Sequence, residues 1–139
     1  MKSKKIDNKF FIRIDPEEEI VSKLTEFCKN NSIKFGNISG IGAVNKVEIG
    51  LYDTLQKKYY SDEMSGAFEI LSINGNITSL NEQPYLHIHI TFADSKHNAF
   101  GGHLNMAIVS ATCEVIIEEF EGEIARSFDE EIGLNLLKI

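Results

Sequence analysis

The sequence lacks the features that define several large classes of protein. No apolar run approaches the roughly 20 residues that a membrane-spanning helix needs, so we expect no membrane partner. The lysine-rich segment 1–10 has neither the apolar region nor the small-residue cleavage site of a secretory signal, which favours a cytoplasmic protein. Basic residues are scarce, since the chain has 14 Lys and Arg residues and 21 Asp and Glu residues. The resulting net charge of −7 argues against non-specific attraction to nucleic acid.

Motifs for phosphate binding and for covalent catalysis are missing as well. Gly101-Gly102 is not followed by Lys and then Ser or Thr, and no G-x-G-x-x-G pattern opens a helix. The nucleophile pattern G-x-S-x-G does not occur either. The two cysteines, Cys28 and Cys113, lie far apart among apolar neighbours, which predicts buried thiols and leaves one disulfide between them as the alternative.

The composition that is present fits one folded domain. The chain has 139 residues, of which 42% are hydrophobic and 25% are charged, the balance of a globular protein with a single core. No internal repeat and no Pro/Ser-rich linker divides the chain. We therefore expect a single domain over residues 1–139.

One helix is predicted, in the N-terminal half. Asp15 is a capping residue, Pro16 suits the first helical position, and the acids that follow suit the positive end of a helix dipole. Apolar residues then recur at helical spacing between Ile20 and Cys28. These signals predict a helix that begins at Asp15-Pro16 and runs to about residue 30.

The rest of the chain has the character of strands. Asn74-Gly75 is a dipeptide that favours a tight hairpin turn, and the glycines between 36 and 42 predict bulges or sharp bends. Strands are predicted where apolar and polar residues alternate or where β-branched and aromatic residues are frequent. These segments are 10–14, 34–44, 46–53, 57–64, 67–73, 76–80, 85–92, 106–120 and the tail 127–139. The predicted fold class is α+β, a twisted and largely antiparallel sheet with one main helix.

The four histidines all fall between positions 87 and 103. His87 and His89 lie two apart in a predicted strand, so their side chains share one face while the alternate apolar residues face the core. His103 follows a Gly-Gly pair, and His97 lies in a polar loop. Neutral imidazoles bind Zn²⁺, and three protein ligands leave a position for water or substrate. The pattern predicts a metal site of His87, His89 and His103, with zinc as the first choice among divalent transition metals.

Other interpretations of this region stay open. A His-x-His pair on a half-buried strand also arises when imidazoles bond backbone carbonyls or face solvent. Asp94 fits a turn-initiating residue, with a hydrogen bond to a ligand histidine as the alternative. Glu69 is an acid in a largely apolar strand, which is explained if its side chain lies on the solvent-exposed face. The alternative is that it lies beside the histidines and serves as a general base or a fourth ligand.

Three motifs, in their order and spacing, resemble the PPC domain, the plant and prokaryote conserved domain. They are Gly-Ala-Phe-Glu-Ile-Leu-Ser-Ile-Asn-Gly-Asn-Ile at 66–77, Leu-His-Ile-His at 86–89 and Gly-Gly-His-Leu at 101–104. The similarity extends over nearly the whole chain, and the two histidine motifs are the pattern of free-standing prokaryotic members. The resemblance implies an α+β fold around an antiparallel sheet, a homotrimer, and the label of predicted DNA-binding protein.

The chain departs from the plant members of that family in two ways. Those proteins carry Arg-Gly-Arg-Pro hooks that enter the DNA minor groove, whereas this acidic chain has no hook and only two arginines, Arg13 and Arg126. The plant members also do not keep the histidines. A metal site near a subunit boundary would then be specific to the prokaryotic branch.

Three functions follow as hypotheses. The first is a trimeric regulatory or assembly module with a three-histidine metal site, not an enzyme, which acts through another protein or a small-molecule ligand. The second is direct DNA binding, which needs one face of the trimer to gather Lys2, Lys4, Lys5 and Lys9 together with Lys57-Lys58. The third is a metal-dependent hydrolase or lyase, with Glu69 or Asp94 as the base.

Overall fold

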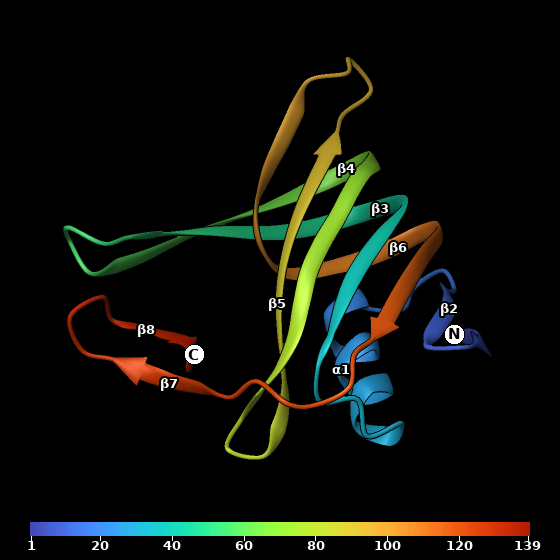
Figure 1. Ribbon diagram of the computed structural model, residues 1–139. Coiled ribbons are helices and arrows are strands. Elements are labelled where there is room, and N and C mark those ends of the chain that lie inside the picture. The colour runs from blue at the N-terminus through green and yellow to red at the C-terminus, as the bar shows by residue number, and fades with distance from the viewer.

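Long antiparallel strands dominate the computed structural model, which describes residues 1–139 (Figure 1). The elements, in chain order, are β1 (Lys2–Ile6), β2 (Lys9–Ile14), α1 (Ile20–Asn30), β3 (Gly36–Asp53), β4 (Lys58–Leu80), β5 (Gln83–Ala93), β6 (Ala99–Glu119), β7 (Arg126–Asp129) and β8 (Leu134–Leu137). The fold class predicted from the sequence, a largely antiparallel sheet with one helix, is confirmed.

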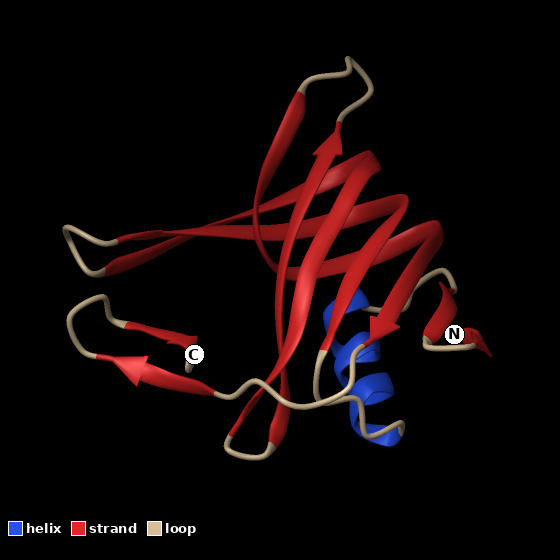
Figure 2. Ribbon diagram, viewed as in Figure 1, coloured by secondary structure: helices blue, strands red, loops and turns tan.

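The main sheet curls until two of its strands meet. Its order is β1-β2-β6-β3-β4-β5, and β5 also pairs with the first part of β6, so that β3, β4, β5 and β6 form a ring. Register shifts occur in β3 between Gly40 and Gly42, where bulges are predicted, and again between Val44 and Lys46, where none is predicted. β7 and β8 form a separate hairpin (Figure 2).

The hydrophobic core lies between the curled sheet and α1, the single helix in Figure 2. In β2, Phe10, Ile12 and Ile14 are buried while the alternate residues are exposed, the pattern of a strand with one face on the core. The Phe27 ring of α1 meets the Phe10 ring edge to face, with 5.3 Å between centroids. α1 also packs against β5 and β6, and therefore supports the two strands that carry the histidines. No helix has the length and apolar character needed to cross a bilayer.

The predicted helix is present, but the predicted start at Asp15-Pro16 is wrong. The Asp15 carboxylate accepts a hydrogen bond from the N-terminal ammonium at 3.0 Å, and Glu17 has a left-handed backbone with φ of 68°, which no helix can include. Glu19 is extended, and its carboxylate accepts hydrogen bonds from the amides of the first turn at 2.8 and 2.6 Å. The helix therefore begins at Ile20, and its end at Asn30 agrees with the prediction.

The predicted hairpin turn at Asn74-Gly75 is also wrong, because both residues lie inside β4. A Cβ at Gly75 would collide with the carbonyl oxygen of His87 on the neighbouring strand, so this glycine permits a close approach of strands. The turn between β4 and β5 is at Asn81 and Glu82, where φ is 51° and 64°. Two consecutive positive φ values are what a two-residue hairpin loop requires.

Several strand boundaries differ from the predicted segments. The predicted segments 34–44 and 46–53 merge into one bulged strand that begins at Gly36. The three predicted segments between 57 and 80 likewise merge into β4, which begins at Lys58. The lysine-rich start of the chain forms β1, which was not predicted, and the tail forms the β7–β8 hairpin in place of one strand. Both cysteines are buried and free, and burial raises the pKa of each thiol to about 12, so the predicted buried thiols are confirmed.

Candidate metal centre

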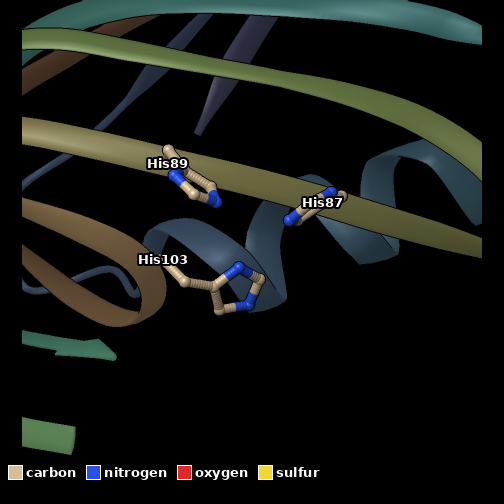
Figure 3. Close-up of side chains that lie close together, drawn as sticks. All are labelled: His87, His89 and His103. Carbon is tan, nitrogen blue, oxygen red and sulfur yellow. The ribbon is translucent and has the colours of Figure 1, made fainter. Parts of the chain in front are cut away.

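The three histidines of the predicted site lie together on two paired strands. His87 and His89 project from the same side of β5, because successive side chains of a strand point to opposite faces. The alternate residues Ile88 and Ile90 point into the core and are buried. His103 is the register partner of His89 across the β5–β6 pair. Figure 3 shows the imidazoles of His87 and His89 on one side of β5, with His103 reaching toward them. A strand pairing between distant parts of the chain thus forms the cluster.

The spacing of the three imidazoles suits a single ion. One nitrogen from each ring lies within 4.8 Å of the other two, and the ring centroids are 5.1, 5.2 and 5.5 Å apart. Nitrogens that hold a tetrahedral zinc ion at roughly 2.0–2.1 Å lie about 3.4 Å apart, so small side-chain rotations would bring these three onto one ion. The donor set is made only of histidines, which suits zinc and other transition metals and does not suit magnesium or calcium.

The surroundings keep two of the histidines in the form that binds metal. Burial, and after it the nearby charges of His103, Arg126 and His89, lower the pKa of His87 to about 4. Burial also lowers the pKa of His103, with a contribution from His89. A metal ligand must be neutral imidazole, and both residues are therefore in the binding state at pH 7 without proton release.

Tyr59 forms one wall beside the cluster. Its ring meets His103 edge to face, with 6.4 Å between centroids, and its hydroxyl donates to Asn105 Oδ1 at 2.6 Å. Asn105 Nδ2 in turn donates to Glu48 Oε1 at 3.2 Å. Gly50, the register partner of His103, makes room for this tyrosine, because a Cβ there would collide with the Tyr59 hydroxyl.

Arg126 contacts the part of β4 that pairs with His87. Its guanidinium donates hydrogen bonds to Asn76 Oδ1 at 2.9 Å and to Thr78 Oγ1 at 2.8 Å, both on β4. Asn76 is the register partner of His87, so its side chain projects on the same face of the sheet. The sequence does not mark Arg126 or Tyr59 as residues of this region, because both reach it through contacts between distant segments.

The other candidate residues lie outside the cluster. Glu69 is exposed on β4, opposite Ala93, and contributes no ligand atom to the histidine group. Asp94 Oδ1 accepts hydrogen bonds from the amides of Lys96 at 2.8 Å and Asn98 at 3.0 Å, which confirms its role in a turn. His97 lies in the same loop, as predicted.

Within one chain, the lysines proposed for DNA binding lie apart, and some of them form ion pairs. Lys5 pairs with Glu119 at 3.0 Å, and Lys9 pairs with Glu118 at 3.5 Å. The tip of the β3–β4 hairpin, which carries Lys57, lies at the opposite end of the molecule from the N-terminus (Figure 1).

Solved structures with the same fold support the family resemblance. A candidate DNA-binding protein from Bacteroides thetaiotaomicron is 37% identical, with a TM-score of 0.97 over 99% of this chain and 96% of that one. A metal-containing protein from Archaeoglobus fulgidus is 35% identical, with a TM-score of 0.89 over 97% of this chain and 96% of that one.

A curated relative is much longer than this chain. The bifunctional protein GlmU of a Synechococcus species is 22% identical over 125 residues, which are 88% of this chain. The chain spans about a fifth of that relative, since the match covers 19% of its length.

Residues 1–121 match the model of the Plants and Prokaryotes Conserved (PCC) domain, also called the PPC domain. The chain therefore belongs to the PCC domain family.

Proposed function

We propose that this protein binds one divalent transition metal per chain, zinc first, through His87, His89 and His103, and acts as a trimeric regulatory or assembly module. The observation that carries the proposal is the convergence of three imidazole nitrogens within 4.8 Å of one another. The related archaeal protein, described as metal-containing, supports it. Three protein ligands leave a position on the ion for a small-molecule ligand.

Self-association is supported by an apolar surface on the sheet. Phe11, Ile41, Leu71 and Ile116 are all more than a third exposed, and they line a groove of about 730 Å³. Phe11 and Ile116 are register partners on β2 and β6, so the surface is continuous across strands. Exposed apolar patches of this kind mark protein–protein contacts, and the proposed homotrimer would bury this one.

DNA binding is the second candidate, favoured by the description of the Bacteroides relative. The ion pairs of Lys5 and Lys9 and the net charge of −7 work against it. A mobility-shift assay across salt concentrations tests it, and absence of a complex even at low salt would eliminate it. The hydrolase or lyase hypothesis gains no support, because Asp94 is committed to its turn and Glu69 lies outside the cluster.

Metal analysis of untagged protein tests the main proposal. We expect about one zinc per chain after loading and removal of free metal, and loss of that zinc in His87→Ala. His97→Ala is the matched control, since it removes a histidine from the nearby loop and leaves the cluster intact. Wild-type protein that takes up no metal, or equal losses in the two variants, would contradict the proposal.

A further inference from the structure

Arg126 carries a positive charge that has no acidic partner in the fold. Its guanidinium donates to three neutral acceptors, the Thr78 hydroxyl, the Asn76 amide oxygen and the Asn135 carbonyl, at 2.8, 2.9 and 2.8 Å. None of the ion pairs in the structure includes it. One N–H on each terminal nitrogen remains without a partner. A half-buried cation without an acidic partner is unusual, especially in a chain whose net charge is −7.

The fold holds this guanidinium in a fixed position. The Ser79 amide donates to the Ile124 carbonyl at 3.0 Å, and Ser79 also forms a parallel bridge with Ala125, which ties the start of β7 to the end of β4. The guanidinium carbon lies 4.8 Å from the centroid of the Tyr85 ring, in a cation–π contact. An arginine anchored by hydrogen bonds and an aromatic ring presents its free N–H groups with little loss of side-chain entropy on binding.

The same guanidinium lies on the face of the sheet that carries the histidines. Asn76, which it contacts, pairs with His87, and Thr78, which it also contacts, pairs with Tyr85, so all of these side chains lie on one face. The face therefore combines the imidazole cluster with one uncompensated positive charge.

We propose that Arg126 is the anion-binding residue of the metal centre, and that the ligand is a small organic acid with two oxygen functions. A carboxylate would pair with the free N–H groups of Arg126, and the second oxygen would occupy the open position on the metal. Such a ligand neutralises the half-buried cation, which no group in the chain does. This inference rests on the metal site proposed above.

Calorimetric titration of the zinc-loaded, untagged protein with malonate tests the inference. We expect wild type to bind malonate and to bind its neutral diamide much more weakly. Arg126→Gln should keep its zinc and lose about 10- to 100-fold in malonate affinity, the range of a charge-assisted hydrogen bond. Arg13→Gln is the matched control, because Arg13 is the only other arginine and its exposed side chain pairs with Asp15. Arg126→Lys should restore part of the malonate affinity, since it keeps the charge.

Each failure has its own signature. Wild type that binds zinc but not malonate, or Arg126→Gln that binds malonate as wild type does, overturns this inference and leaves the metal site standing. Both Arg126 variants could lose zinc binding and malonate binding together, and circular dichroism would then show whether they still fold. That result would assign the arginine a structural role and would also overturn this inference. Wild type that takes up no zinc overturns the metal site itself and this inference with it.

Discussion

Gly75→Ala tests whether the close approach of β4 and β5 positions the metal centre. A Cβ at this position would collide with the His87 carbonyl oxygen and would lie 3.0 Å from the Ile88 Cα. Both obstacles are backbone atoms, so no side-chain rotation relieves them, and the strands must move apart at the residue that carries the first ligand. Overpacking of this kind costs about 1–3 kcal/mol.

The cost is measured by thermal unfolding of metal-free protein at one fixed concentration, because the proposed self-association would make the midpoint depend on concentration. For a chain of this length, about 1 kcal/mol shifts Tm by roughly 4 °C, so we expect a fall of about 4–12 °C. Zinc affinity should fall as well, since His87 moves with its backbone. Ser61→Ala, an exposed change elsewhere on β4, is the control. Wild-type Tm and zinc affinity in Gly75→Ala would refute the reasoning.

Three further predictions address the turn, the helix and the acid response. Glu82→Gly should stabilise the protein by up to about 1 kcal/mol, because glycine adopts the left-handed backbone of this turn without strain, and a lower urea midpoint would contradict this. Glu19→Ala should destabilise the protein by about 1–2 kcal/mol in the same urea assay. The substitution removes the cap of α1 and the acceptor of a hydrogen bond from the Ala107 amide. An unchanged midpoint would count against the cap. The metal-free protein should lose stability as the pH falls from about 6.5 toward 4, because the His87 pKa of about 4 lies below its unfolded value and the unfolded chain binds more protons in that window. His87→Asn should flatten that dependence in denaturation curves measured at several pH values.

The sequence was most informative where local periodicity determines structure. The two-residue spacing of His87 and His89 places them on one face of any strand, and the alternate apolar residues identify the buried side. The helix was similarly marked by its apolar spacing. Its start was misplaced because Asp15 and Pro16 are also good turn residues, and the hydrogen bond between Asp15 and the N-terminus is a contact that no local pattern reveals.

Contacts between distant segments account for what the sequence could not predict. The dipeptide Asn74-Gly75 predicts a turn because Asn-Gly favours one, yet the neighbouring strand requires a residue without a side chain at Gly75. The register that sets His103 opposite His89 depends on how the ring of strands closes. The bridge between Ser79 and Ala125 brings Arg126 to β4, and nothing in its neighbours in sequence indicates that contact.

Anomalous X-ray scattering at the zinc edge, from a crystal of zinc-loaded protein, tests the central claim most directly. The account predicts one anomalous peak per chain, about 2.0–2.1 Å from a nitrogen of each of His87, His89 and His103. A map with no peak among these three side chains, or with zinc bound elsewhere on the chain, would contradict it.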